Sequence, residues 1–173
     1  TVPEIWILGS SAFGAQVAAH FGLPYAFAWF FTDGLGGKEA IEIYRDHYKP
    51  SQRHKKPNPA ICVWALAAET HEEAKYHFSS RARWQLYRDK GLHLSFETPD
   101  VSMAEEYNEY EQTRIEELRQ KTFVGTGKEV AERITELANY LDVEEIAIVT
   151  WAHSDEPRRN SYSEIAKAFN MKA

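Results

Sequence analysis

Hydrophobic residues along this chain form short continuous runs, and each run is followed by a stretch in which apolar residues recur at helical spacing. The run at 5–8 is typical of a strand buried on both faces and the run at 60–68 of a buried strand, and those at 25–31 and 145–151 are further strand candidates. The stretches between them have apolar residues every three or four positions, which predicts helices. Strands that alternate with helices in this way predict a parallel sheet with helices outside it.

Glycine, proline and hydroxyl residues mark where the predicted helices begin and end. Phe13, Val17 and Phe21 indicate one face of the first helix, and Gly22 predicts its end. Two later helices are each preceded by a hydroxyl residue with a glutamate three positions on, the pattern of a capping box. The two pairs are Thr70 with Glu73 and Thr126 with Glu129.

The segment 90–122 interrupts the alternation. It contains Pro99 and then a highly charged stretch, 105–119, that predicts an exposed helix. We expect this segment to be a helical insertion that lies outside the core.

The predicted elements amount to about four βα units in a single domain, residues 1–173. Two architectures satisfy this order: a small open α/β sheet, or half of a (β/α)₈ barrel. A complete barrel needs roughly 200–250 residues or more. The chain is therefore too short to close such a barrel alone.

Charge and composition narrow the classes of partner. The formal net charge is -6, which argues against nucleic acid as a partner, because phosphate backbones bind basic surfaces. The sequence has no signal peptide and no apolar stretch long enough to span a membrane, so we expect a cytoplasmic protein with no membrane partner. The single cysteine, Cys62, lies in an apolar run and is expected to be buried.

The junction after the first run is the candidate binding site. Gly9, Ser10 and Ser11 form a predicted turn between a strand and a helix. The turn's N–H groups and the positive end of the helix would point at one spot, where the serines add further donors, so the turn suits an anion such as a phosphate. The alternative is an ordinary turn in which the serines cap the helix.

Tryptophans form a second pattern, since Trp6, Trp29, Trp64 and Trp151 fall one in each predicted strand. Trp29 and Trp151 lie near the carboxyl ends of their strands, where parallel α/β proteins place their sites. Aromatic rings there would line a planar cofactor or an apolar substrate, or else simply pack in the core. Core packing is favoured for Trp64 and Trp151, whereas both interpretations stay open for Trp29.

No recognised catalytic motif or metal-binding motif is present, so no catalytic residue and no metal ligand is assigned. His71 and His77 are about two helical turns apart but lack a third ligand. Polar residues after the last run suit either the rim of a site or a solvated helix start. These residues are His153, Asp155, Arg158 and Arg159.

Four segments, in this order along the chain, resemble a known family. They are Pro-Glu-Ile-Trp-Ile-Leu-Gly-Ser-Ser (3–11), Ala-Gln-Val-Ala-Ala-His-Phe-Gly-Leu-Pro-Tyr-Ala-Phe-Ala (15–28), Phe-Val-Gly-Thr (123–126) and Ile-Val-Thr-Trp (148–151). Together they are similar to the C-terminal half of bacterial luciferase-like monooxygenases, which are flavin-dependent (β/α)₈ barrels.

The resemblance implies a fold and a reaction. The chain would supply the last four βα units of a TIM barrel, with 90–122 as the family's insertion. Gly9, Ser10 and Ser11 would contact the phosphate of FMN, and Trp29 would lie beside the isoalloxazine ring. Gly14 stands where the family has a phosphate-contacting threonine, so that hydrogen bond would be absent. The reaction would use O₂ and reduced FMN, supplied by a reductase, to oxygenate a small organic substrate.

The first four βα units of such a barrel have no counterpart in the sequence. Because a half barrel exposes unpaired strand edges and its apolar interior, we expect a fragment of a longer protein, a homo-oligomer, or a half that pairs with a separate N-terminal chain. Two alternatives to the monooxygenase remain: a catalytically inactive half-barrel fragment that self-associates, and a reductase that uses FMN or a deazaflavin on the same scaffold.

Overall fold

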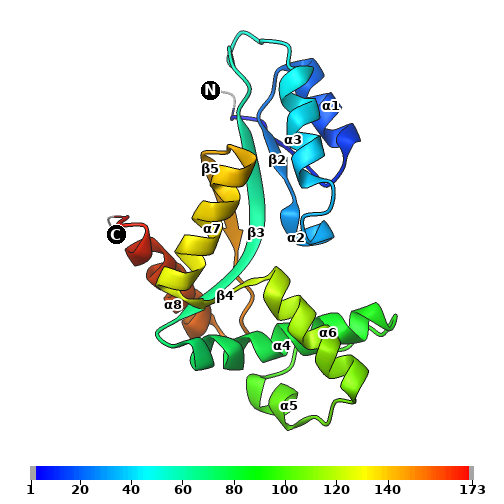
Figure 1. Cartoon of the computed structure of the whole chain (residues 1–173), viewed down its shortest axis with the longest axis vertical. Coiled ribbons are helices and arrows are strands. Elements are labelled where there is room, and N and C mark those ends of the chain that lie inside the picture. The colour runs from blue at the N-terminus through cyan, green and yellow to red at the C-terminus, as the bar shows by residue number, and fades with distance from the viewer. Residues whose placement is uncertain (1–2, 172–173) are drawn as a thin grey trace. The chain divides into compact units, whose positions relative to one another are not determined.

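Strands and helices alternate along the computed structural model, which describes residues 3–171 and is shown with its element labels in Figure 1. The strands are β1 (Ile7–Gly9), β2 (Tyr25–Phe27), β3 (Pro59–Ala68), β4 (Phe123–Thr126) and β5 (Glu145–Val149). The helices are α1 (Ala12–Phe21), α2 (Trp29–Thr32), α3 (Gly37–Asp46), α4 (His71–Asp89), α5 (Pro99–Ala104), α6 (Glu109–Lys121), α7 (Gly127–Leu141) and α8 (Asp155–Ala168). This order confirms the predicted α/β class.

The described chain divides into two compact units. The first contains the residues up to Val63 together with Glu136–Val149. The second contains Trp64–Thr135 and the residues from Thr150 onward. The ten-residue strand β3 therefore contributes its first half to one unit and its second half to the other.

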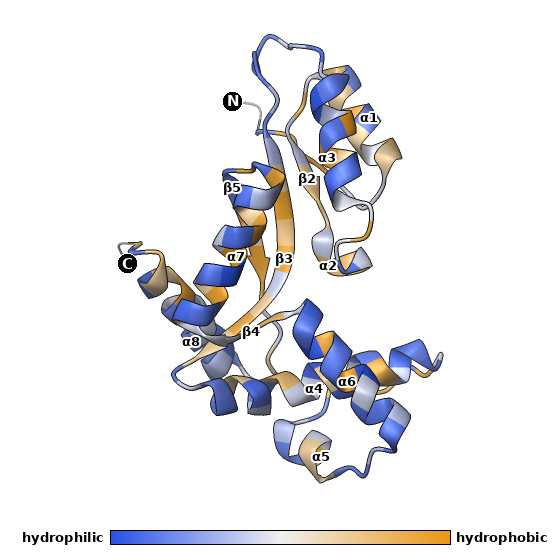
Figure 2. Ribbon diagram, in the orientation of Figure 1, coloured by the Kyte–Doolittle hydropathy of each residue, from blue (hydrophilic) through white to orange (hydrophobic). Residues whose placement is uncertain are grey.

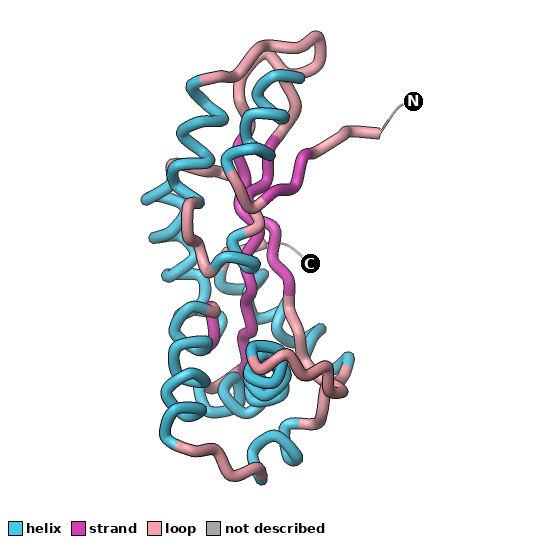
Figure 3. Tube along the Cα trace, turned by 90° about the vertical axis from the view of Figure 1, so that its right-hand side faces the viewer, coloured by secondary structure: helices cyan, strands magenta, loops and turns pink. Residues whose placement is uncertain are grey.

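Short parallel strands form the sheet of the first unit. Strand β1 pairs with β2 from Ile7 opposite Tyr25 to Gly9 opposite Phe27, and β2 pairs with the start of β3. The chain enters β1 through a short loop (Figure 3). Because the two strands are parallel and in register, β1 and β2 end at the same edge of the sheet.

Helix α1 has the predicted extent but buries a different face from the one that the sequence suggested. It ends at Gly22, which caps it in the left-handed conformation with φ 61°, as predicted. The apolar residues at four-residue spacing point outward instead: Phe13 is 75% exposed and Phe21 is 63% exposed. The buried side chains of the helix are small, namely Ala15, Ala18 and Ala19.

The predicted strand 25–31 is wrong beyond its first three residues. Strand β2 ends at Phe27, and Trp29 begins the short helix α2. The chain then turns through Gly34, whose φ is 85°, and the indole ring of Trp29 lies against this turn. A Cβ atom on Gly34 would come within 2.2 Å of that ring, and one on Gly37 within 2.7 Å. This close packing of ring on backbone prevents the aromatic run from continuing as a strand.

The second unit is built on the second half of β3. Its residues Ala65 to Ala68 pair in parallel with β4, from Phe123 to Thr126, so the Phe-Val-Gly-Thr segment is a strand. The strand β3 is mostly hydrophobic (Figure 2), and every residue in it except Pro59 and Trp64 is buried. It thus matches the prediction of a buried strand.

Both predicted helix starts of this unit are present. The Thr70 hydroxyl accepts a hydrogen bond from the Glu73 N–H at 3.1 Å, at the start of α4. The backbone N–H of Thr126 donates to the Glu129 carboxylate at 2.7 Å, at the start of α7. The helix boundaries in this part of the chain therefore follow from local hydrogen bonding.

The expectation that 90–122 lies outside the core is wrong for its second helix. Helix α6 is indeed charged, but it also packs on the second unit's core. Its Leu118 is only 3% exposed and belongs to one cluster of buried residues with Phe78 of α4 and Val124 of β4. The high charge of the stretch concealed the narrow apolar side that Ile115 and Leu118 present.

No helix in the described part of the chain is long and apolar enough to cross a membrane.

Candidate functional site

The Gly9-Ser10-Ser11 turn lies at the carboxyl ends of β1 and β2. The carbonyl of Gly9 accepts a hydrogen bond from the Ala28 N–H at 2.8 Å, which joins the turn to the end of β2. Trp29 follows Ala28 directly. The structure therefore brings Gly9 and Trp29, which are 20 residues apart in the sequence, to the same edge of the sheet.

Both serine side chains of the turn are exposed. Ser11 occupies the N-cap position of α1 with extended backbone, φ -150° and ψ 164°, but its hydroxyl makes no capping hydrogen bond. The first N–H groups of a helix have no partners within the helix. At this helix they are therefore available to an anion, and the serine hydroxyls are available beside them.

Two glycines allow the turn to fold tightly. A Cβ atom built on Gly9 would lie 3.3 Å from the Cα of Gly14, and one built on Gly14 would lie equally close to Gly9. The Tyr25 ring is the next neighbour of both, at 3.5 and 3.6 Å. Any side chain at either position would crowd the start of the helix against the end of the strand.

Tyr25 supports the turn through its hydroxyl, a role that was not predicted from the sequence. Its hydroxyl lies 3.3 Å from the carbonyl oxygen of Ser11 and 3.5 Å from that of Gly9, and it donates to these acceptors. Burial raises the pKa of Tyr25 to about 12, so the phenol stays neutral at physiological pH. The one sequence feature that pointed to this role is that Tyr25 places a polar hydroxyl at the start of an otherwise apolar strand.

The Trp29 side chain is half-buried. Its ring meets that of Phe27 edge to face, with centroids 6.2 Å apart, and the backbone of Gly34 and Gly37 covers another part. Part of the indole remains exposed, and the residue itself lies at the same edge of the sheet as the Gly9 turn. Trp29 can therefore serve as an apolar wall, while it also stabilises the α2–α3 turn.

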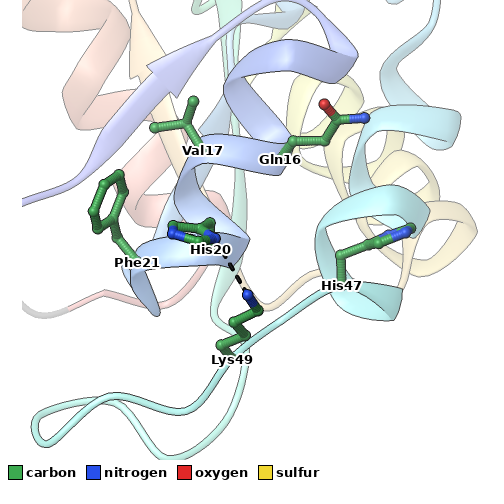
Figure 4. A pocket seen from close by; sticks show the side chains of 6 residues that line it. All are labelled: Gln16, Val17, His20, Phe21, His47 and Lys49. Carbon is green, nitrogen blue, oxygen red and sulfur yellow. Dashed lines mark hydrogen bonds between the residues drawn. The ribbon is translucent and has the colours of Figure 1, made fainter.

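A separate pocket of about 350 Å³ lies on the helical side of the first unit (Figure 4). His20 of α1 and Lys49 point toward one another there, with 3.3 Å between Nδ1 and Nζ. The pocket is lined by Gln16, Val17, His20, Phe21, His47 and Lys49. None of the residues of the candidate turn belongs to it.

In the second unit the structure joins Trp64 and Trp151, whose ring centroids are 4.5 Å apart. Of the polar residues that follow β5, Arg158 lines a pocket beside Trp151, and Asp155 binds its guanidinium at 2.6 Å. His153 stacks nearly parallel to the Phe96 ring, at a centroid distance of 6.4 Å. The two interpretations of this region are thus both partly met: Asp155 is in the first turn of α8, and Arg158 faces a pocket.

His71 pairs with a carboxylate rather than with His77. Its Nδ1 lies 3.2 Å from the Glu129 carboxylate. The hydrogen bond from the Thr126 backbone N–H and then the interaction with His71 lower the pKa of Glu129. Within residues 3–171 no group of three histidine, cysteine or acidic side chains is placed to hold a metal ion.

Residues 1–143 match the family model described as luciferase-like monooxygenase. The chain belongs to this family. Among curated relatives of the luciferase-like monooxygenases, it is 35% identical over 170 residues to the uncharacterized protein YwcH of Bacillus subtilis, covering 98% of this chain and 51% of the relative. It is also 28% identical over 158 residues to a protein named luciferase-like monooxygenase in Escherichia coli K12, covering 91% and 47%. The chain spans about half the length of the curated relatives that it matches.

Solved structures give the same fold. The crystal structure of apo-MsnO8 superposes with a TM-score of 0.83 at 28% identity, covering 98% of this chain and 52% of that one. A more distant neighbour shares only the fold, with a TM-score of 0.60 at 16% identity over 99% of this chain and 50% of its own. It is the oxygenating constituent of the Pseudomonas putida enzyme 3,6-diketocamphane monooxygenase, solved in complex with FMN. The predicted resemblance to luciferase-like monooxygenases is therefore confirmed.

Proposed function

We propose that this chain is part of an FMN-dependent monooxygenase that oxidises a small organic substrate with O₂ and reduced flavin. Membership of the luciferase-like family supports the reaction class. The observation that carries the proposal is the set of hydrogen-bond donors at the start of α1. The exposed hydroxyls of Ser10 and Ser11 lie next to the first N–H groups of the helix, and the Ser11 hydroxyl makes no capping hydrogen bond.

The turn fits a phosphate group. The two glycines let the start of α1 approach the end of β1 closely, and on this inner side the Tyr25 hydroxyl donates to the carbonyls of Gly9 and Ser11. The amides and the hydroxyls of Ser10 and Ser11 would then hold the FMN phosphate by charge-assisted hydrogen bonds. Trp29 would lie beside the isoalloxazine ring. When bound, the flavin would supply the oxygen chemistry, and these residues would orient it and keep water from it.

The remainder of the site would come from outside this sequence. Because the chain covers about half of its relatives, we propose that an N-terminal half, in the same polypeptide or as a separate chain, or a second copy of this chain completes the flavin site. Reduced FMN would be supplied by a reductase.

Titration of the full chain with FMN, followed by flavin fluorescence, tests the phosphate site. We expect Ser10→Ala with Ser11→Ala to weaken FMN binding by roughly 1–3 kcal/mol, because hydrogen bonds to a charged phosphate are lost. Ser154→Ala is the matched control, since Ser154 is also an N-cap residue without a capping side-chain bond, at α8. The control is expected to bind FMN as the unmodified chain does.

The outcomes separate the alternatives. Absence of quenching by the unmodified chain up to about millimolar FMN, the weak end of useful affinity, would overturn flavin binding by this chain. Equal affinity of the double variant and the control would leave Ser10 and Ser11 without a role in binding. If FMN binds, consumption of O₂ with reduced flavin and substrate distinguishes a monooxygenase from a reductase.

A further inference from the structure

A pocket in the second unit is walled by aromatic rings and reached by an arginine. We call it the Trp151 pocket. It has a volume of about 360 Å³, at the small end of the range for ligand sites. Its lining is Trp84, Phe96, Thr150, Trp151, Ala152 and Arg158.

The rings of the Trp151 pocket stand at steep angles to one another. Trp151 meets Trp84 at a centroid distance of 4.9 Å and 64°, and it meets Phe96 at 5.8 Å and 83°. On another side it meets Trp64 at 4.5 Å. These three contacts fix the Trp151 ring in place, so the pocket presents rigid ring faces and edges. Rigid aromatic surfaces bind planar rings in offset-stacked or edge-to-face arrangements.

Guanidinium groups lie in the pocket and against rings of this cluster, although the chain as a whole carries a net charge of -6. The Arg158 guanidinium lines the pocket itself. The guanidinium of Arg88 lies over the Trp84 ring at 4.9 Å, and that of Arg81 lies over the Trp64 ring at 3.9 Å. Asp155 accepts a hydrogen bond from Nη2 of Arg158. A guanidinium has five N–H donors, so Arg158 retains donors for a carboxylate in the pocket.

We infer that the Trp151 pocket binds a planar aromatic molecule that carries a carboxylate, with the ring packed against Trp84, Phe96 and Trp151 and the carboxylate on Arg158. This inference goes beyond the proposed function, because none of these residues belongs to the turn assigned to the FMN phosphate. As a substrate pocket, it would select planar aromatic carboxylates.

Isothermal titration of the full chain, without flavin, tests the pocket with three probes. Naphthoate has both the ring and the charge, naphthylmethanol has the ring alone, and decanoate has the charge on a flexible chain. We expect naphthoate to bind with Kd below roughly 1 mM and each of the other two to bind about tenfold more weakly. Absence of naphthoate binding, or equal binding of decanoate, would overturn the inference.

Two variants locate the bound molecule. Arg158→Gln is expected to weaken naphthoate binding about tenfold and to leave naphthylmethanol binding unchanged. The neighbouring Arg159→Gln, which is exposed and does not line the pocket, is the matched control and should bind naphthoate normally. Phe96→Leu keeps an apolar wall but removes a ring, so both aromatic probes should bind it several-fold more weakly. Equal affinities of the Arg158 and Arg159 variants would contradict the assignment.

A competition experiment separates this inference from the proposed function. Naphthoate and FMN should bind independently if the pocket serves a substrate. If FMN displaces naphthoate, the pocket is the site of the flavin ring and the inference of a substrate pocket is wrong. If FMN does not bind but naphthoate does, the proposed flavin site fails and the aromatic pocket stands.

Discussion

A side chain at position 22, where the chain has Gly22, is disfavoured for two separate reasons. The φ of Gly22, 61°, is left-handed, and a Cβ atom there would come within 2.3 Å of the Lys49 carbonyl oxygen. Gly36 has a similar φ of 74°, but a Cβ atom on it would meet nothing within 4 Å. Substitutions at Gly22 and Gly36 therefore distinguish the cost of left-handed backbone from the cost of a steric clash.

We predict that Gly36→Ala lowers the free energy of unfolding by about 1 kcal/mol, the cost of left-handed backbone for a residue with a side chain. Gly22→Ala should lower it by at least about 1 kcal/mol more, because the Lys49 backbone must also move. Urea unfolding of both variants measures the difference. Equal losses would show that the collision at Gly22 is relieved without cost.

Two buried tyrosines of the first unit give stability a dependence on alkaline pH. Burial raises the pKa of Tyr25 and of Tyr44 to about 12 from an ordinary value of 10.0. Above pH 10 the unfolded chain therefore releases these protons before the folded chain does. The free energy of unfolding is fully retained below pH 10 and falls as pH rises toward 12.

The prediction is a shallower alkaline decline in Tyr25→Phe, which has no proton to release at that position. Urea unfolding at a series of pH values from about 8 to 11 measures the slope. Tyr110→Phe, at an exposed position, is the control and should keep the slope of the unmodified chain. A Tyr25→Phe slope identical to the control would contradict the burial-based explanation.

At the scale of elements, helix α6 joins the segment 90–122 to the core of the second unit. We predict that Leu118→Ala lowers the free energy of unfolding by about 2–5 kcal/mol, because it leaves a cavity between α6, α4 and β4. Met103→Ala in α5 removes an exposed side chain and should change stability by less than about 0.5 kcal/mol. Similarly small effects of both substitutions would indicate that Leu118 adds little to the core, as expected for an insertion that lies outside it.

Local sequence patterns predicted most element positions, but they did not predict what each element faces. The capping residues Thr70 and Thr126 act through neighbours three residues away, so the sequence alone revealed them. The end of β2 depends on the packing of the Trp29 ring on Gly34, and the burial of α1 depends on alanines that carry little hydrophobic signal. Such features arise from contacts between elements, which a local period does not encode.

The candidate site shows the same division. The order of strand, glycine turn and helix identified Gly9, Ser10 and Ser11 as a potential anion-binding turn from sequence alone. The support that Tyr25 gives to that turn depends on the pairing of β1 with β2, and the sequence does not state this register. The rings around Trp151 come from segments up to 87 residues apart, counting from Trp64 to Trp151, so their meeting was equally hidden.

At the scale of the whole molecule, exposed apolar side chains on α1 favour association. Phe13 and Phe21 are largely exposed on a helix that also carries half-buried Val17. Strand β1 is the terminal strand in the pairing order β1–β2–β3–β4 of the described chain, so its outer edge is available as well.

We predict that light scattering finds an oligomer, and that Phe13→Ser with Phe21→Ser shifts it toward the monomer without loss of helical content. Both side chains are exposed, so the double variant should fold normally. Leu35→Ser, another exposed apolar position but in the loop before α3, is the control and should not change the oligomeric state. A monodisperse monomer of the unmodified chain would contradict the prediction.

The contacts of Trp151 with two other indoles have an optical consequence. Excited states of chromophores in van der Waals contact couple to one another, and the angles among these rings make the coupling chiral. Trp64, Trp84 and Trp151 should therefore produce an exciton couplet in circular dichroism that exists only while the second unit is folded. The aromatic cluster would act as a built-in, label-free reporter of that unit, which can be read apart from the helical signal of the rest of the chain.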